Sequence, residues 1–452
     1  MMRLLPALLA FALLATACSS DVLDEVASSG DSSSESEVAE ESSGNTTAPT
    51  VAEAEEEEPF VVEGPTTTFV PPLDGPFADG GISTADFDQS NVIIEDPPAL
   101  PQVLASLPWD TDWSRRTVDN WDEFLRGLQT PDPRDGIPPI DAPVFESVAR
   151  AAEWISPDEP GALVQLNGEA RFYPLSIMTR HEIVNDAFGD VPVAVTFCPL
   201  CNTSIAFDRR VDGEVLRFGV SGLLRNSDLV MWDNRTTSLW QQLTGGAVVG
   251  EHAGVELEWV PTSVVSFRQF AENFPEGASL AGESGFGRQS YGANPYAGYS
   301  SSARPFLFDG EADDRLPALS RVVGISEGAT VAAYSFDAAV AAGVLNDEVD
   351  GRPIVVFTGG TTTDALDASN IALADQIGSA IAYEASVDGQ ALTFTANGDE
   401  TFTDDQTGST WSIVGVAIDG ELVGSELGPI EHRNEFWFAW QAFFGPDTLR
   451  EL

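Results

Sequence analysis

Cys198 and Cys201 are the residues of this chain whose type and spacing are best suited to chemistry. They stand three positions apart in Phe197-Cys198-Pro199-Leu200-Cys201, directly after an apolar stretch that alternates like a β-strand. This spacing suits a small disulfide ring or two bonds to one metal ion. Free backbone N–H groups at the strand end would stabilise a thiolate at Cys198 and lower its pKa. Cys198 would then attack a substrate, and Cys201 would resolve the mixed disulfide.

His181 and Glu182 are the candidate partners of the two thiols. They lie in the segment just before the apolar strand, so a short return of the chain would bring the imidazole near the sulfurs as a base or a ligand. We expect Glu182 to help tune the thiolate. Three roles stay open for the cysteine pair: a redox-active dithiol, a metal site and a structural disulfide.

The metal alternative has a defined ligand set. Cys198, Cys201 and His181 would bind zinc or copper and leave one position open, which Glu182, His252 or His432 would fill. A site with four thiolates is excluded because the chain has three cysteines. His252 itself is interpreted as an exposed loop residue.

An internal repeat separates residues that the fold needs from residues that one copy alone holds. Residues 162–280 recur weakly as residues 322–449, with an insertion around residues 363–378 in the second copy. Matched pairs that predict shared structural roles are Tyr173 with Tyr334, Asn185 with Asn346, Asp186 with Asp347, Asp233 with Asp404 and Trp240 with Trp411.

The candidate chemical residues have no equivalent in the second copy. At one offset of 161 residues, His181 aligns with Ala342, Glu182 with Gly343, Cys198 with Gly359 and Cys201 with Thr362. Because a fold made twice does not need them, these four residues are predicted to serve function. A less informative pair, Arg225 and Asp228, is interpreted as a surface ion pair or as the lining of a pocket.

The pattern around these residues predicts an α+β fold that is predominantly β. Short alternating stretches bounded by Gly and Asp-Gly turns include residues 163–166, 193–197, 205–210 and 215–220. Helical spacing appears over residues 176–188 and 264–274. A thioredoxin fold is not expected, because the residues after Cys201 alternate like a strand instead of opening a helix.

The chain divides by composition into six parts. The predicted parts are a lipoprotein signal peptide with its lipobox (1–18), a disordered acidic linker (19–72), an irregular N-terminal arm (73–143), a first module (144–281), a linker (282–320) and a second, degenerate module (321–452). The apolar start ends in Ala15-Thr16-Ala17-Cys18, which predicts lipidation of Cys18. We therefore expect a lipid-anchored protein on the extracytoplasmic face of the cell membrane.

Charge excludes one class of partner. The chain has 72 acidic residues against 21 basic ones, and all of the basic ones are Arg. Phosphate binding needs clustered cations, so nucleic acid is not an expected partner. The expected partners are therefore the membrane, through Cys18, and an unknown redox partner or small-molecule substrate.

Several long motifs resemble domain-of-unknown-function family 3179. They include residues 181–186, 192–201, 207–213, 227–232, 238–240 and 436–440, and the likeness extends from about Asp135 to the C-terminus. Some members of that family are described as selenoproteins, which implies that selenium can replace one sulfur of the Cys198-Cys201 motif and favours redox chemistry. The resulting hypothesis is a thiol–disulfide or peroxide oxidoreductase without a cofactor; the alternative is a protein that binds zinc, copper or another ligand.

Overall fold

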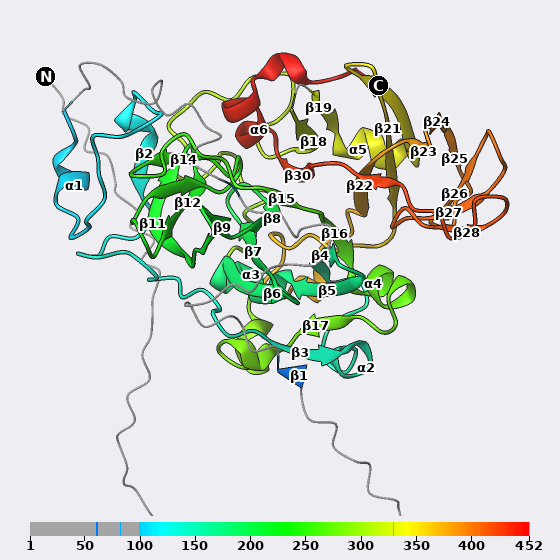
Figure 1. Ribbon diagram of the computed structural model, residues 1–452, viewed down its shortest axis with the longest axis horizontal. Coiled ribbons are helices and arrows are strands. Elements are labelled where there is room, and N and C mark those ends of the chain that lie inside the picture. The colour runs from blue at the N-terminus through cyan, green and yellow to red at the C-terminus, as the bar shows by residue number, and fades with distance from the viewer. Residues whose placement is uncertain (1–59, 62–81, 83–98, 329, 452) are drawn as a thin grey trace, which may run out of the picture. The chain divides into compact units, whose positions relative to one another are not determined.

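The first half of the protein is built from three antiparallel or mixed sheets and short helices (Figure 1). The computed structural model describes residues 60–61, 82, 99–328 and 330–451, which belong to one compact unit. Cys18 and most of the predicted acidic linker lie outside the described residues. The first sheet has the strand order β1 (Phe60–Val61), β3 (Val144–Ser147), β17 (Ala278–Leu280), β5 (Glu169–Pro174), β4 (Pro160–Leu166) and β16 (Thr262–Ser266). The second has the order β15 (Trp259–Val260), β8 (Thr203–Asp208), β7 (Val191–Cys198) and β6 (Ile183–Phe188). The third has the order β14 (Ala247–Val249), β13 (Leu239–Gln241), β12 (Asp228–Asp233), β11 (Phe218–Arg225) and β2 (Phe124–Arg126).

The second half follows the same order of elements with fewer strands. Its sheets are β19 (Thr330–Ser335), β18 (Arg321–Glu327) and β30 (His432–Phe436); β20 (Val344–Val349), β21 (Arg352–Gly359), β22 (Ser379–Glu384) and β29 (Gly428–Pro429); and β25 (Phe394–Ala396), β26 (Thr401–Asp404), β27 (Thr410–Ser412) and β28 (Ala417–Asp419). The hairpins β9 (Arg210–Val211) with β10 (Glu214–Val215) and β23 (Ser386–Val387) with β24 (Gln390–Ala391) also match. The fold is therefore mostly β, as the sequence predicted.

Short helices connect the sheets in both halves. They are α1 (Gln102–Ala105), α2 (Val148–Ala151), α3 (Leu175–His181) and α4 (Phe267–Asn273) in the first half, and α5 (Phe336–Ala342) and α6 (Trp437–Phe444) in the second. The helix expected over residues 176–188 stops at His181, and β6 follows it, because Glu182 adopts a positive φ of 59°. The helix expected over 264–274 begins only at Phe267, where Ser266 and Gln269 form a capping box.

Residues shared by the two copies make the same contacts. Asp233 accepts the indole N–H of Trp240 at 3.0 Å, and Asp404 accepts that of Trp411 at 3.0 Å. Both aspartates also accept the backbone N–H of a serine five residues later at 3.1 Å. The phenol of Tyr173 donates to Asp186 and that of Tyr334 donates to Asp347 in the same way. These contacts support the proposal that the halves are related copies.

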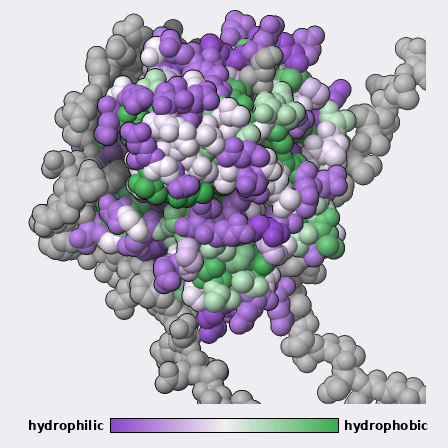
Figure 2. Space-filling view, turned by 90° about the vertical axis from the view of Figure 1, so that its right-hand side faces the viewer, coloured by the Kyte–Doolittle hydropathy of each residue, from purple (hydrophilic) through white to green (hydrophobic). Residues whose placement is uncertain are grey.

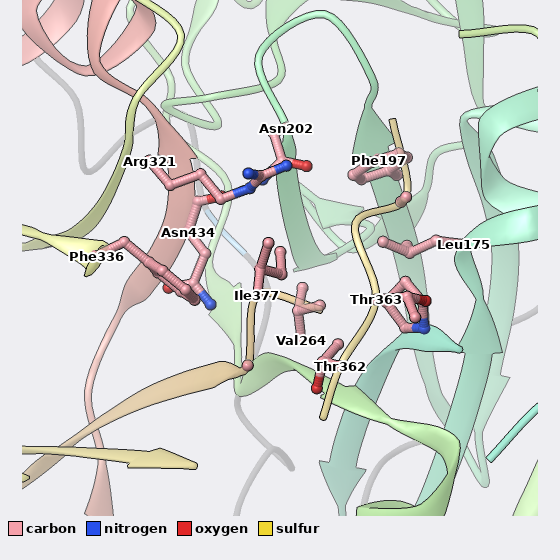
Figure 3. Close-up of a pocket in the computed structure, with 13 residues that line it drawn as sticks. Leu175, Phe197, Asn202, Val264, Arg321, Phe336, Thr362, Thr363, Ile377 and Asn434 are labelled. Atoms are coloured by element: carbon pink, nitrogen blue, oxygen red, sulfur yellow. The ribbon is translucent and has the colours of Figure 1, made fainter. Parts of the chain in front are cut away.

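The last strand and helix of each half pack against the other half. β30 lies beside β8, where the N–H of Phe436 donates to the carbonyl of Cys201 at 2.9 Å. Reciprocally, β16 lies beside β22, where the Ser379 hydroxyl donates to Gln269 at 2.8 Å. A cavity of about 30 Å³ remains between the halves. Figure 3 shows Leu175 and Phe197 of one half facing it together with Phe336 and Ile377 of the other.

The surface and the helices of the protein can both be described by their hydropathy. On the face drawn in Figure 2, hydrophilic residues predominate and hydrophobic ones form small separate patches. Among the described residues, no helix combines the length and apolar character needed to cross a membrane.

The equivalent aspartates generate a matched test of the fold. We expect Asp404→Ala and Asp233→Ala each to lower the free energy of unfolding by about 3 kcal/mol, because each strands a buried indole N–H and several backbone donors. Asp405→Ala, at an exposed neighbour, should cost less than about 0.5 kcal/mol. Urea unfolding followed by tryptophan fluorescence measures all three. A loss at one aspartate without a comparable loss at the other would contradict the equivalence of the two turns.

Candidate dithiol–carboxylate site

Two free thiols and one carboxylate converge inside the first half. Cys198 ends β7, and Cys201 lies in the turn that leads into β8. Cys198 is 2% exposed and Cys201 is fully buried. Their sulfurs and a carboxylate oxygen of Asp228 all lie within 4.8 Å of one another. Within the described residues, no other group of three or more His, Cys, Asp or Glu side chains is arranged as candidate metal ligands in this way.

Asp228, interpreted from the sequence as part of a surface ion pair or of a pocket lining, was not predicted to join the thiols. It opens β12 and is fully buried, and its Oδ2 accepts the Gln241 amide at 2.5 Å and the Leu243 N–H at 3.0 Å. Its Oδ1 is buried without a hydrogen-bond partner. Burial raises the pKa of Asp228 to about 6. Both thiols point at the backbone carbonyl that precedes it, with Ser227 O at 3.9 Å from Cys198 Sγ and 3.5 Å from Cys201 Sγ.

The predicted surface ion pair of Arg225 with Asp228 is wrong. Arg225 instead pairs with Glu123 at 2.9 Å, while Asp228 faces the core. The two residues flank a tight turn and are directly opposite across the strands. They do not form an ion pair because Arg225 turns to Glu123 and Asp228 is held by Gln241 and Leu243. A usable signal was present, because an aspartate begins a strand that is otherwise apolar over Leu229, Val230 and Met231.

Glu182 occupies a strained position that the second copy fills with glycine. It caps the C-terminus of α3 with φ of 59°, and Gly343 caps α5 with φ of 80°. A side chain at such a position costs roughly 1 kcal/mol, and strain of this kind concentrates at functional sites. Glu182 is buried, its Oε1 accepts the phenol of Tyr296 at 3.3 Å, and burial raises its pKa to about 8. The structure therefore keeps a costly acid beside the thiols.

His181 is not brought into the cluster, contrary to the sequence-based prediction. Its Nδ1 lies 2.7 Å from the carbonyl of Pro138 and its Nε2 lies 2.8 Å from the hydroxyl of Tyr291. The ring of Phe286 covers it at 4.6 Å. Consecutive side chains at a helix end point about 100° apart, so Glu182 can face the thiols while His181 faces away. Both ring nitrogens are thus engaged in holding neighbouring segments.

The thiols are less acidic than expected. Burial raises the pKa of Cys198 and raises that of Cys201 well above its ordinary value, and the nearby Asp228 adds to both shifts. The lowered pKa expected for Cys198 at a strand end is not found, because burial and the charges of Asp228 and Glu182 outweigh the hydrogen bonds from the thiol and backbone N–H of Cys201. Without a cation, the site favours protonated thiols.

The other two histidines do not join the site. His252 is buried, not exposed as predicted, since its turn packs the imidazole against the ring of Trp240 at 5.6 Å. His432 is buried in β30, where Nδ1 lies 2.9 Å from the carbonyl of Ile430 and burial lowers the pKa to about 4. Most of the aromatic run after it lies in α6, and its residues from Phe436 to Trp440 belong to the core.

The corresponding place in the second half is filled by hydrogen-bonded side chains. Thr362, the counterpart of Cys201, lies 2.5 Å from Ser379, hydroxyl to hydroxyl. Gln269 from the first half accepts from Ser379 at 2.8 Å and donates to Glu400 at 2.8 Å. The second half therefore keeps the frame of the site without its thiols.

The comparisons with known proteins agree with the motifs. No curated protein matches the chain, and no solved structure does. The family model described as protein of unknown function (DUF3179) matches residues 134–448, which is more than half of the chain and includes Cys198, Cys201 and Asp228. The chain is therefore a member of the DUF3179 family.

Proposed function

We propose that this protein is a metal-binding lipoprotein whose centre is formed by Cys198, Cys201 and Asp228. The observation that carries the proposal is the convergence of two free thiols and a carboxylate oxygen of Asp228 within 4.8 Å of one another in the protein interior. Thiolate and carboxylate are both ligands that Zn²⁺ accepts in a tetrahedral set. Binding would release the thiol protons and give the buried carboxylate a partner.

Charge favours a divalent ion over Cu⁺. Two thiolates and one carboxylate carry three negative charges, and the charged groups acting most strongly on Cys198 are the acids Asp228 and Glu182. In a medium of low dielectric constant, uncompensated charge is costly. A divalent ion would leave one negative charge and a monovalent ion two. The ion that this site suits best is therefore Zn²⁺ or a cation of similar charge and softness.

Glu182 is the candidate for the fourth group. Its carboxyl is held by one long bond of 3.3 Å from Tyr296, and its charge acts on Cys198. Glu182 lies outside the group of three, and it would have to leave Tyr296 to become a ligand. Its place in a strained backbone position, where the other copy has Gly343, is the second observation that supports this role.

The cellular setting of the proposal rests on the sequence. The lipobox ending in Cys18 and the excess of acidic residues, 72 against 21 basic ones, suit an exported protein tethered to the membrane surface. The metal site would then work in the extracytoplasmic space. No nucleic-acid partner is proposed.

Metal content tests the proposed centre. We expect the full chain, reconstituted with Zn²⁺ and dialysed, to retain one equivalent by elemental analysis, and its Co²⁺ form to show thiolate-to-metal absorption. Cys201→Ser and Asp228→Asn should each weaken binding on the order of 100-fold, because direct ligands matter at least as much as the groups that orient them. His181→Gln is the control and should bind as the wild type does. Wild-type protein that is folded by circular dichroism yet retains no metal would refute the proposal.

A second candidate function is thiol–disulfide exchange. It is favoured by the spacing of the two free thiols and by their shared contact with the carbonyl of Ser227. The dithiol would pass two electrons and two protons to a substrate disulfide, giving a Cys198–Cys201 disulfide and two substrate thiols. Asp228, whose pKa burial raises to about 6, would accept the proton of the attacking thiol.

Thiol titration separates the two functions. In full-length Cys18→Ser protein, the remaining thiols are Cys198 and Cys201. We expect Zn²⁺ to slow their oxidation by glutathione disulfide by at least about tenfold, because metal-bound sulfur is shielded from exchange. Reversible oxidation at the same rate with and without Zn²⁺ would favour the redox function over the metal centre.

A further inference from the structure

Two segments that the copies do not share meet above the dithiol–carboxylate cluster. The first is residues 285–307 of the predicted linker, here named the cover segment. The second is residues 363–378, the insertion of the second copy, here named the insertion segment. The two segments contact each other through hydrogen bonds.

The cover segment is bound directly to the residues around the thiols. The phenol of Tyr299 donates to the carbonyl of Leu200, inside the cysteine motif, at 3.0 Å. The phenol of Tyr296 reaches Glu182, and the hydroxyl of Ser227 donates to the carbonyl of Phe306 at 2.5 Å. Tyr296 is near enough to Cys198 for the two groups to influence each other's ionisation. The segment thereby closes the space next to both sulfurs.

The insertion segment holds the cover segment in place from the other side. The amide of Asn294 donates to the carbonyls of Ala365 at 2.8 Å and Ala368 at 2.9 Å, and its backbone N–H donates to Ser369 at 2.8 Å. The N–H of Tyr299 donates to the carbonyl of Leu366 at 2.9 Å. The second copy therefore contributes to the site of the first through a piece that the first lacks.

The cover segment is anchored more firmly at its start than over the thiols. At its start Arg288 pairs with Glu146 and the ring of Tyr291 is buried. From Asn294 to Phe306 the attachments are hydrogen bonds and the ring contact of Tyr299 with Phe436, and the segment belongs to no sheet. Gly287 and Gly298 have φ of 86° and 79°, so the backbone turns at points without a side chain. Phe286 and Phe306 are each 53% exposed, so the two ends contribute little burial to closure. Such segments open more easily than the strands beneath them.

We propose that the cover segment is a gate over Cys198, Cys201 and Asp228, held shut by the insertion segment, through which a metal ion enters and leaves without unfolding of the sheets. The need for a gate follows from burial, because both sulfurs are shut off from solvent in the closed form. Opening of the part from Asn294 to Phe306 breaks the hydrogen bonds of Asn294, Tyr296 and Tyr299 and separates Tyr299 from the ring of Phe436. It requires no break in the pairing of β7, β8 or β12. The identity of the ion rests on the proposed function, but the gate itself does not.

Thiol labelling tests the gate separately from the metal. The protein is the full chain with Cys18→Ser, reduced and stripped of metal, and the probe is the disulfide reagent dithionitrobenzoate. We expect Asn294→Ala and Tyr299→Phe each to raise the labelling rate of Cys198 and Cys201 by about 3- to 10-fold, since each removes bonds of about 1 kcal/mol that exist in the closed form only. Zn²⁺ transfer from the loaded protein to a chelator should speed up by a similar factor.

Tyr383→Phe is the matched control. Its phenol donates to the carbonyl of Ile413 at 3.1 Å, a bond like that of Tyr299, but within the second half. This variant should leave the labelling rate unchanged. Labelling that is equally slow in all variants, or that rises with urea as steeply as global unfolding does, would overturn the gate. Faster labelling of the variants, in a protein whose wild type retains no Zn²⁺ on reconstitution, would uphold the gate and remove the metal function alone.

Discussion

The main physical constraint on this structure is that several acidic groups are buried next to one another. Two thiols, Asp228 and Glu182 share a part of the core that water does not reach, and burial raises the pKa of each of them. Such an arrangement is unfavourable unless the groups stay protonated or a cation neutralises them. The backbone strain at Glu182 adds to this cost. A fold that retains these features gains stability elsewhere, and the large shared cores of the two halves supply it.

The two halves of the chain, which the sequence repeat predicts to be related copies, contribute differently to the site. The turns around Asp233 and Asp404 and the Tyr–Asp pairs are kept in both copies, because they hold the sheets together. The thiols are kept in one copy alone. The second copy supports that site from outside: β30 hydrogen-bonds to Cys201, and its insertion holds the segment that covers the thiols.

The site takes its geometry from three elements that are far apart in the sequence. β7 ends at Cys198, α3 ends just before Glu182, and β12 begins at Asp228. Each side chain stands at an end of an element, where the backbone changes direction and the side chain is free of the regular pattern of burial. The closed, dry surroundings suit tight retention of an ion better than turnover of a bulky substrate. Exchange with the medium then becomes a question of how often the cover opens.

The sequence by itself determined the local features: the alternating strands, the repeat, the family and the cysteine pair with its acidic neighbour Glu182. These depend on spacing along the chain, since side chains of a strand alternate and a repeat preserves its offsets. Tertiary structure alone decided that Asp228 joins the sulfurs, that His181 turns away to Pro138 and Tyr291, and that Tyr299 of the predicted linker binds the carbonyl of Leu200. Contacts between residues so far apart in the sequence depend on how sheets pack and on which way the chain leaves a helix. No periodicity in the sequence records those directions.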